Sequence, residues 1–400
     1  MSSRSPAPLD ADERLHALDI LRGLALLGMI LVHFHQKMRL EASGLEDLIG
    51  WGVWVLVEQK AWGTFAFLFG VGFAVLLRRL EARGQAILPI YLRRLGTLAV
   101  FGLIAEIGFG FQILLEYACW GVALLLIRRW STPALLMTAV LAACARPVVA
   151  ELTALHGWWT GVAPAASAGA ALSQAVQAAS RHGDYAALLS ARWALFLGTL
   201  PYTWRDLLPD VNLALFTLGL LAVRHRVIDE PKRHVRLIAG WMTFGALAWA
   251  TGWLVLTHLP PMPVPGADQP LAYGLGIIQD QWLCLTYIGA VLLLLAYRPV
   301  WTRRLAVFGR AGRMALTNYM LQAVALDALS SHYGFGLKLR PYTYVVAAAL
   351  LFGAEAALSR LWLAHFRFGP LEWLWRTITY SRVQPLRRSP VSLPPAAVEM

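Results

Sequence analysis

Two side chains in the first apolar stretch of the chain have types and a spacing suited to chemistry. Arg22 and His33 are eleven positions apart. On an α-helix this is about 16 Å along the axis, and the two side chains share one face to within about 20°. Ionisable groups inside an apolar helix are costly and usually face a cavity or a partner. The face would present a guanidinium, which suits phosphate binding, and an imidazole, which suits general-base catalysis.

Each of these side chains also has a purely structural explanation. Arg22 could pair with Asp19, three positions earlier on the same helix. His33 could be a core histidine that hydrogen-bonds to a neighbouring helix. The sequence leaves both explanations open.

A second polar group surrounds a predicted turn between two later apolar segments. Leu95–Ile127 is 33 residues long and contains neither Lys nor Arg. Two full crossings of a bilayer need about 34 to 40 residues, so the chain must turn tightly, and Gly108–Gly110 is the expected turn. Glu106, Gln112 and Glu116 cluster around it. Carboxyl groups at membrane depth predict a water-filled cavity; the alternative is solvation at the headgroup level.

Further polar side chains lie in two segments of the C-terminal half. Asn318 and Gln322, four positions apart, share one helix face beside Tyr319. Hydrogen bonds between helices are the usual role of such amides, and a place along a substrate path is the alternative. The run Gln279–Gln281 predicts either a cavity wall or a solvated helix end.

Several common catalytic and binding motifs are absent from the sequence. It contains no P-loop, no Gly-x-Ser-x-Gly elbow and no His-Glu-x-x-His motif. Its three cysteines, Cys119, Cys144 and Cys284, form no Cys-x-x-Cys or Cys/His cluster. ATP-driven chemistry and a bound metal are therefore not expected.

The elements that must position these residues are membrane-spanning helices. Of the 400 residues, 58% are hydrophobic and 14% are charged, whereas soluble domains carry about 25% charged residues. Too few charges are present to coat a water-soluble fold of this size. The sequence therefore predicts an all-α, polytopic integral membrane helix bundle in a lipid bilayer.

Ten apolar segments are candidates for transmembrane helices, because a crossing needs about 20 mostly apolar residues. They are Ile20–Phe34, Ala61–Leu77, two within Leu95–Ile127, Pro133–Leu152, Val211–Val223, Leu237–Leu256, Leu275–Ala296, Arg313–Leu329 and Thr343–Leu363. Leu45–Val57, which is short and contains two tryptophans, predicts an interfacial or re-entrant helix.

The basic residues support this count. The net charge is +12, with 35 Lys and Arg against 23 Asp and Glu. If the N-terminus is cytoplasmic, alternating segments place 24 of the 35 inside and 8 outside. Lys and Arg accumulate on the cytoplasmic side of membrane proteins, so the bias predicts that both termini are cytoplasmic. Topology then explains the basic excess, and a nucleic-acid partner is not expected.

The same arrangement divides the chain into four parts. Residues 1–18 form a cytoplasmic segment, and residues 19–364 form the bundle with an outer insertion at 152–210. Residues 365–381, which are aromatic and interspersed with arginine, predict an interfacial cytoplasmic helix. Residues 382–400 are rich in proline and predict a disordered tail.

The motif Asp19-x-x-Arg22-Gly23, followed by an apolar helix and His33, resembles the opening of the transmembrane acyltransferase superfamily. The spacing of the arginine and the histidine resembles the acyltransferase-3 branch. Members of that branch O-acylate sugars and cell-envelope glycans.

Motifs along the rest of the chain resemble another branch, the bacterial membrane proteins of the domain of unknown function 418 family. They run from near residue 14 to near residue 380: Phe67-Leu-Phe-Gly70-Val-Gly72, Arg93-Arg94-Leu95, Phe101-Gly102-Leu103, Gly312-Arg313-Met-Ala-Leu-Thr-Asn318-Tyr319 and Phe366-Arg367-Phe368-Gly369-Pro370-Leu371-Glu372-Trp373-Leu374-Trp375. The chain departs from that family at three places. The usual third-span histidine is replaced by Ala105 or Glu106, the usual fourth-span aspartate by Gln112, and an asparagine that ends the first span by His33.

The resemblance implies a membrane-embedded acyltransferase of the bacterial inner membrane. The implied donor is cytoplasmic acyl-CoA, mainly acetyl-CoA. The acceptor is a hydroxyl or amine of a glycan, a lipid or a small molecule at or across the membrane. His33 is the expected general base, and Glu106 or Glu116 would orient its imidazole. The residues expected to bind the donor are Arg22, Arg93, Arg94 and Asn318.

Two other functions stay open at this point. Intramembrane His, Glu and Asp also suit a transporter of a lipid or small metabolite, although the sequence shows no inverted repeat and no matched pair of broken helices. A non-catalytic membrane protein is the other alternative, because the family's third-span histidine is missing. A homodimer is compatible with the sequence.

Overall fold

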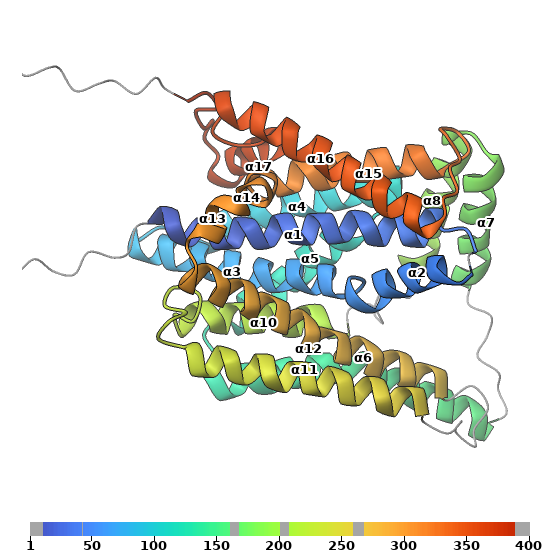
Figure 1. Cartoon of the computed structure of the whole chain (residues 1–400), viewed down its shortest axis with the longest axis horizontal. Coiled ribbons are helices and arrows are strands. Elements are labelled where there is room, and N and C mark those ends of the chain that lie inside the picture. Colours follow the sequence, from blue (N-terminus) through green and yellow to red (C-terminus); the bar gives the residue numbers. More distant parts are fainter. Residues whose placement is uncertain (1–10, 42, 161–167, 201–207, 259–267, 389–400) are drawn as a thin grey trace, which may run out of the picture.

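The computed structural model describes residues 11–41, 43–160, 168–200, 208–258 and 268–388. Within these ranges the chain is a helix bundle with two isolated β-bridges and no sheet (Figure 1), which confirms the predicted all-α class. The helices are α1 (Ala11–Met38), α2 (Leu45–Leu56), α3 (Lys60–Ala82), α4 (Ile87–Phe109), α5 (Ile113–Ile127), α6 (Thr132–Thr160), α7 (Ala168–His182), α8 (Tyr185–Thr199), α10 (Val211–Arg224), α11 (Val235–His258), α12 (Asp268–Tyr297), α13 (Val300–Arg304), α14 (Ala306–Arg313), α15 (Ala315–Ser330), α16 (Pro341–His365) and α17 (Pro370–Tyr380).

Each of the ten predicted spans corresponds to one of these helices. Seven segments of the described chain are long and apolar enough to cross a membrane. They lie in α1, in α2 and α3 taken together, and in α4, α6, α11, α12 and α16. Helices α5 and α10 are apolar but have only 15 and 14 residues, and α15 has 16. At about 1.5 Å per residue, these three are shorter than a hydrocarbon core of about 30 Å. The protein is therefore a polytopic bundle, and the number of complete crossings stays a prediction.

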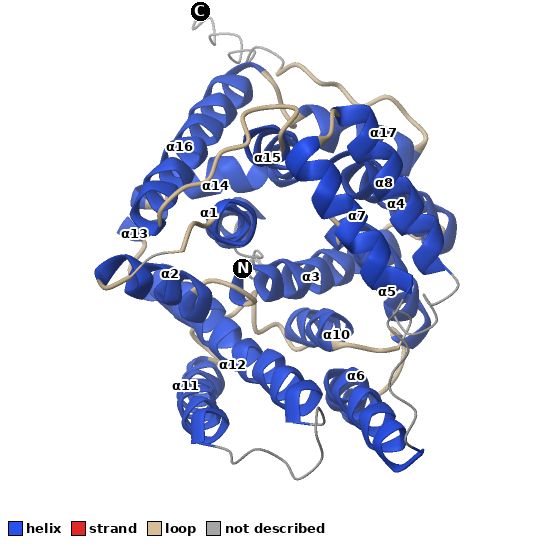
Figure 2. Ribbon diagram, turned by 90° about the vertical axis from the view of Figure 1, so that its right-hand side faces the viewer, coloured by secondary structure: helices blue, strands red, loops and turns tan. Residues whose placement is uncertain are grey.

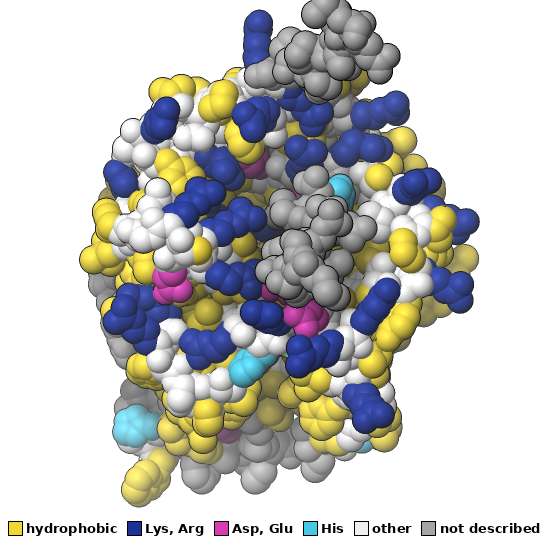
Figure 3. Space-filling view, turned by 90° about the vertical axis from the view of Figure 1, so that its left-hand side faces the viewer, with side chains coloured by type: hydrophobic (Ala, Val, Ile, Leu, Met, Phe, Trp, Pro, Cys, Tyr) yellow, Lys and Arg dark blue, Asp and Glu magenta, His cyan; other side chains and the backbone are white. Residues whose placement is uncertain are grey.

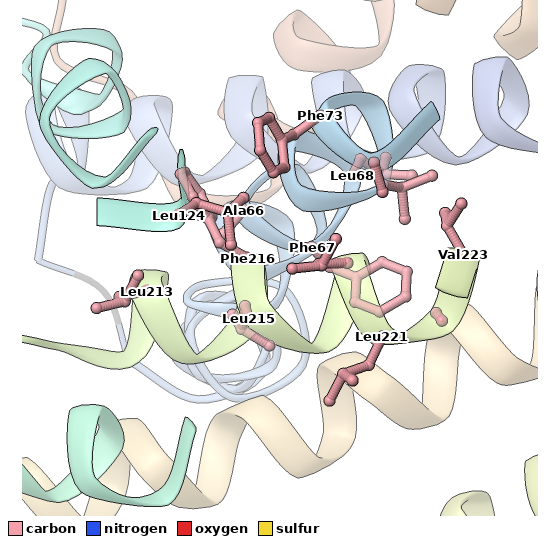
Figure 4. Close-up of a cluster of buried hydrophobic side chains, with 14 of the residues drawn as sticks. Ala66, Phe67, Leu68, Phe73, Leu124, Leu213, Leu215, Phe216, Leu221 and Val223 are labelled. Carbon is pink, nitrogen blue, oxygen red and sulfur yellow. The ribbon is translucent and has the colours of Figure 1, made fainter. Parts of the chain in front are cut away.

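Helix α10 can be short because it lies inside the protein. Ten of its 14 residues are buried, and it packs against α3, α5 and α6, as the end-on view in Figure 2 shows. Gly70 and Gly219 allow the close approach of α3 and α10. A Cβ atom on Gly70 would collide with the backbone of Phe216, and one on Gly219 with the backbone of Phe67. Apolar side chains of α3 and α10 meet around this contact (Figure 4).

Helix α1 has a second contact of this kind, with α14. A Cβ atom on Gly23 would collide with the backbone of Phe308, and one on Gly312 with the backbone carbonyl of Asp19. Helix α1 also contacts α3, α15 and α16, so it occupies the middle of the bundle (Figure 2). Gly23 in the N-terminal motif therefore has a packing role.

The two ends of the bundle differ in charge. One end, called the basic end, is formed by residues 83–86, 128–131, 225–234 and 298–305 together with α17, and Lys and Arg side chains cover much of it (Figure 3). The opposite end, called the far end, carries α2, α7 and α8 (Figure 1). The segments predicted to be cytoplasmic thus lie together at the basic end.

Helix α17 joins two of the motifs at the basic end. The Glu372 carboxylate accepts hydrogen bonds from the backbone N–H groups of Leu316 and Thr317, at 2.7 and 3.0 Å, and from the Thr317 hydroxyl at 2.6 Å. These are the free N–H groups at the start of α15, which an acidic side chain stabilises. The Trp375 indole donates to the carbonyl of Arg94 at 2.9 Å, and the Arg94 guanidinium lies 3.8 Å above the Trp375 ring.

The C-terminal tail differs from the prediction in its first residues. Residues 382–388 are not disordered: they run beside residues 365–367, with backbone hydrogen bonds of 2.8 and 3.1 Å. The polar, proline-rich composition of this segment favours disorder, but the backbone hydrogen bonds to residues 365–367 hold it in place. Residues 389–400 of the predicted tail, and residues 1–10 of the predicted N-terminal segment, lie outside the described residues.

The insertion predicted at residues 152–210 is largely helical where it is described. Helix α6 continues to Thr160, and α7 and α8 pack together as a helical hairpin at the far end. Residues 161–167 and 201–207 lie outside the described part. Because α8 contacts α4, the hairpin lies against the α4–α5 turn.

Candidate functional site

A cavity of about 370 Å³ lies in the half of the bundle nearer the far end. Its walls come from α1, α3, the α4–α5 turn, α6, α12, α15 and the start of α10. Of the residues predicted around the turn, Gln112 and Glu116 line the cavity, whereas Glu106 is half-buried in α4 outside the lining. The structure thus places a cavity beside the predicted turn, with one of the two predicted carboxyl groups, Glu116, in its wall.

His33 lies in the cavity wall with its ring almost fully enclosed. It belongs to the last part of α1, is 7% exposed, and its ring centre lies 4.4 Å from that of Phe111 in an edge-on arrangement. Its Nδ1 atom has no hydrogen-bond partner among the described residues, and the same holds for two other buried atoms of the lining, Trp62 Nε1 and Gln281 Oε1. Buried polar atoms are normally paired, so this wall is suited to binding a polar ligand.

The α4–α5 turn shapes the wall opposite α1. Gly110 ends α4 in the left-handed conformation, with φ of 72°, and its N–H bonds to the carbonyl of Glu106 at 2.9 Å. Glycine adopts this conformation without steric cost. The turn runs from Gly110 to Gln112, so it overlaps the predicted Gly108–Gly110 segment at Gly110, and it brings Phe111 and Gln112 to the cavity.

A charged cluster forms another part of the wall. Arg146 of α6 lies 3.5 Å from Glu116 and 3.2 Å from Asp210. The Asn212 amide donates to the Glu116 carboxylate at 3.1 Å, and the Trp120 indole donates to the same oxygen at 3.4 Å. Asp210 also caps α10, because it accepts from the backbone N–H groups of the first turn. Of this cluster, the sequence pointed only to Glu116.

Lys37 is a cavity residue that sequence reasoning missed. It follows His33 by four positions, and its Nζ lies 4.3 Å from the centre of the Phe111 ring and 3.4 Å from the carbonyl oxygen of Phe109. Lys37 could have been found from its spacing, because residues four positions apart lie on the same face of a helix and His33 was already a candidate. The distribution of Lys and Arg over alternating segments instead places Lys37 among the eight basic residues of the outer segments.

A buried ion pair beside the cavity holds the α4–α5 turn. The Arg192 guanidinium donates to both oxygens of Asp327, at 2.5 and 3.0 Å, and to the carbonyl of Gly108 at 2.7 Å. Ser331 and Tyr333 also donate to Asp327, each at 3.1 Å. Burial, reinforced by the Asp327 charge, raises the pKa of Tyr333 to about 12, so its hydroxyl keeps the proton that it donates. The hairpin of α7 and α8 is thereby tied to α4 and α15.

The predicted donor-binding arginines lie away from the cavity, at the basic end. Arg22 pairs with Asp19 at 2.8 Å and keeps 29% of its side chain exposed, as the structural explanation of the sequence requires. Arg93 is exposed and donates to the carbonyl of Pro89 and to the Ser381 hydroxyl. Arg94 stacks on α17, as described above. The structure brings these three arginines to one end of the bundle, and His33 toward the other.

Asn318 occupies an interior position rather than the cavity wall. It is completely buried in α15, and its amide donates to the carbonyl of Ala311 and to the Ser359 hydroxyl of α16, both at 3.0 Å. Its neighbour Gln322 donates to Glu355 at 2.8 Å. This is the pattern of hydrogen bonds between helices. Tyr319, between these two amides in the sequence, does line the cavity.

The polar run of the eighth span divides between two roles. Gln281 lines the cavity, whereas Asp280 forms an ion pair of 2.5 Å with the buried Lys60. Gln279 donates to the carbonyl of Trp249 in α11 at 2.9 Å. Among the described residues, no group of three or more His, Cys, Asp or Glu side chains is arranged to hold a metal ion.

Comparisons with family models divide the chain into two matched parts. Residues 14–188 match the model described as heparan-alpha-glucosaminide N-acetyltransferase, catalytic. Residues 222–382 match the model described as protein of unknown function (DUF418). The first part contains His33, Lys37, Glu116 and Arg146, together with the Arg93-Arg94 motif that α17 contacts. The second part contains α17 itself and the Gly312–Tyr319 motif.

Similar proteins extend over almost the whole chain. The uncharacterized protein YxaH of Bacillus subtilis is 30% identical over 97% of this chain and 99% of its own length. An uncharacterized 39.9 kDa protein of Bacillus acidopullulyticus, described as lying in the amylase 3′ region, is 25% identical over 95% of this chain and 97% of its own. The uncharacterized protein YeiB of Escherichia coli is 27% identical over 93% and 98%. No solved structure matches the chain.

Proposed function

The chain belongs to the DUF418 family of multi-pass membrane proteins, and from this premise we propose that it is an acyltransferase. It transfers an acyl group, mainly acetyl, from acyl-CoA to a hydroxyl or amine acceptor bound in the cavity. The observation that carries the proposal is the enclosed His33 imidazole, with an unpaired nitrogen, in a cavity lined mainly by the part that matches an acetyltransferase catalytic domain.

In the proposed reaction His33 acts as the general base. It takes the proton of the acceptor hydroxyl or amine while the acceptor oxygen or nitrogen attacks the thioester carbonyl. The carbon–sulfur bond then breaks, and the CoA sulfur leaves with the proton that His33 received. Glu116, in the same cavity, is held by donors from Arg146 and Asn212. Glu116 would stabilise the positive charge that develops on the imidazole when it takes the proton.

The donor would enter from the basic end. Arg22 uses one nitrogen for Asp19 and remains partly exposed. Arg93 is exposed at the same end of the bundle, so both can contact the phosphates of CoA. The pantetheine arm, rather than the protein, would span the roughly 16 Å of α1 between Arg22 and His33. The basic end would face the cytoplasm of a bacterial inner membrane.

The proposal is tested with labelled acetyl-CoA and the purified protein in lipid nanodiscs. We expect saturable binding of acetyl-CoA and release of CoA faster than in empty nanodiscs, with the label passing to an acceptor or to water. Absence of binding at millimolar acetyl-CoA would contradict the acyltransferase and favour the transporter. A cytoplasmic reporter signal from fusions at Arg226 and an outer signal from fusions at Arg181 would support the orientation, and the reverse would contradict it.

A further inference from the structure

Lys37 is a cation of the cavity wall for which the proposed reaction has no use. Lys37 and His33 lie on the same face of α1, one turn apart. The Nζ atom of Lys37 and the ring centre of His33 lie 4.3 and 4.4 Å from the centre of one ring, that of Phe111. An ammonium group and the proposed base therefore approach the same part of the cavity.

The other cations around the cavity already have carboxylate partners. Arg146 lies within 3.5 Å of both Glu116 and Asp210. Lys60, which is 2% exposed, pairs with Asp280 at 2.5 Å. A buried charge that is paired in this way has little need of a ligand.

Among the described residues, Lys37 forms no ion pair with a carboxylate. Its hydrogen bond to the carbonyl of Phe109 is long, at 3.4 Å. The Asp327 carboxylate attracts the Lys37 ammonium and the Arg192 guanidinium repels it. Both Asp327 oxygens already accept hydrogen bonds from Arg192, so Asp327 does not supply Lys37 with a partner. A half-buried ammonium that has no carboxylate partner favours an anion beside it.

We propose that the acceptor carries an anionic group, a phosphate or a carboxylate, which Lys37 binds while the acceptor hydroxyl or amine reaches His33. This inference rests on the proposed acyl transfer. The pantetheine arm of CoA has no anionic group near its thioester, so the charge bound at Lys37 belongs to the acceptor. A bare aliphatic alcohol or amine would leave the ammonium unpaired.

The rest of the cavity suits the neutral part of such a molecule. Trp62 Nε1 and Gln281 Oε1 supply one free donor and one free acceptor, which match hydroxyl or amide groups. A cavity of about 370 Å³ is of the size used for small ligands. Gln36 and Gln112 are exposed at the rim, so a polar molecule can enter from the far end.

The test compares glycerol 3-phosphate with glycerol by isothermal titration of the purified protein in nanodiscs of neutral lipid. We expect saturable binding of glycerol 3-phosphate and none of glycerol. Lys37→Met should weaken the binding by roughly ten- to a hundredfold, the range expected for one charge-assisted contact. Lys37→Arg should restore most of it. Arg181→Met, which removes an exposed charge from α7 at the same end, should change nothing.

Equal binding of the two probes, no binding of either, or unchanged binding in Lys37→Met would overturn the inference. If Lys37→Met does not fold, the comparison of the two probes on the unaltered protein decides alone. Binding of acetyl-CoA is measured separately, so its failure would remove the acyltransferase and leave the anion site standing. Nanodiscs of phosphatidylglycerol distinguish the source of the anion: they compete with the probe if the ligand is a lipid headgroup, and do not if it is a solute.

Discussion

The two ends of helix α1 use polar residues in opposite ways. At the basic end the polar side chains are paired within the protein: Arg22 bonds to Asp19, and Glu372 caps α15. In the cavity near the far end, His33 has an unpaired nitrogen and Lys37 has no ion-pair partner among the described residues. Polar groups that are satisfied internally stabilise the fold, whereas unsatisfied ones are available for a ligand. The comparison therefore assigns the proposed chemistry to the cavity near the far end of α1. At the basic end the polar side chains are mainly structural, and the exposed part of Arg22 remains available to a donor.

The largest expected effect is on activity, at His33. His33→Asn keeps a polar side chain able to hydrogen-bond. Loss of a general base typically costs about 10²–10⁴-fold. We therefore expect acetyl transfer to fall by that factor in both His33→Asn and His33→Ala, while acetyl-CoA binding and thermal stability stay close to those of the unaltered protein. Full activity in His33→Asn would move the base to Glu116.

The next largest effect is on stability, at the buried pair that holds the α4–α5 turn. Arg192→Met leaves Asp327 charged and buried, which costs about 3–5 kcal/mol. The midpoint of thermal or denaturant unfolding should fall sharply. Arg181→Met is the control, and it should be neutral because Arg181 is exposed on α7. Adding Asp327→Asn to Arg192→Met should recover part of the loss; no recovery would show that the pair is not the cause.

Substitution of the arginines at the basic end should weaken binding of acetyl-CoA without changing His33, the proposed base. Arg93→Ala removes an exposed guanidinium, and one lost charge-assisted contact should weaken acetyl-CoA binding by roughly ten- to a hundredfold. Arg129→Ala removes an exposed charge from the loop before α6 at the same end and should have no effect. Unchanged acetyl-CoA affinity in both Arg93→Ala and Arg22→Ala would make the basic end purely structural.

The smallest effect is expected at the cap of α15. Glu372→Ala removes the acceptors of three hydrogen bonds, and loss of a helix cap costs about 0.5–2 kcal/mol. Burial raises the pKa of Glu372, so the folded state holds its proton more tightly than the unfolded state. Stability due to this group is then greatest below the unfolded pKa of about 4.3 and is lost as the pH rises through the folded pKa. The penalty of Glu372→Ala should shrink over that range, whereas Glu81→Ala, exposed at the same end, should show neither effect.

Much of the fold was predictable because its signals are local. Hydropathy marked each of the ten helices that correspond to the predicted spans, and the length of Leu95–Ile127 alone required the tight turn that Gly110 makes. The ends of α5 and α10 were less evident, since a short helix can be apolar either by crossing a membrane or by lying inside the protein. The order of residues 382–388 was missed because it depends on backbone pairing with a segment after α16.

The site was predictable only in part. His33 and Glu116 were found by residue type and depth, and both line the cavity. Asp210 and Lys37 were missed because charged residues near helix ends are usually solvated. Arg146 lies in the middle of α6 and was missed because its partners, Glu116 and Asp210, are far from it along the chain. Asn318 was assigned to the donor, but its amide is occupied between α15 and α16.

The amino-acid sequence by itself determined the membrane class, the helices, the turn and the helix face shared by Arg22 and His33. These follow from composition and from helix geometry, which act over about 20 residues. Only the tertiary structure decided which polar groups are paired. Arg192 meets Asp327 across 135 positions and Lys60 meets Asp280 across 220. A side chain reaches only a few ångströms, so its partner is set by which helices pack together, and that is also why the unpaired wall around His33 emerges only in the folded chain.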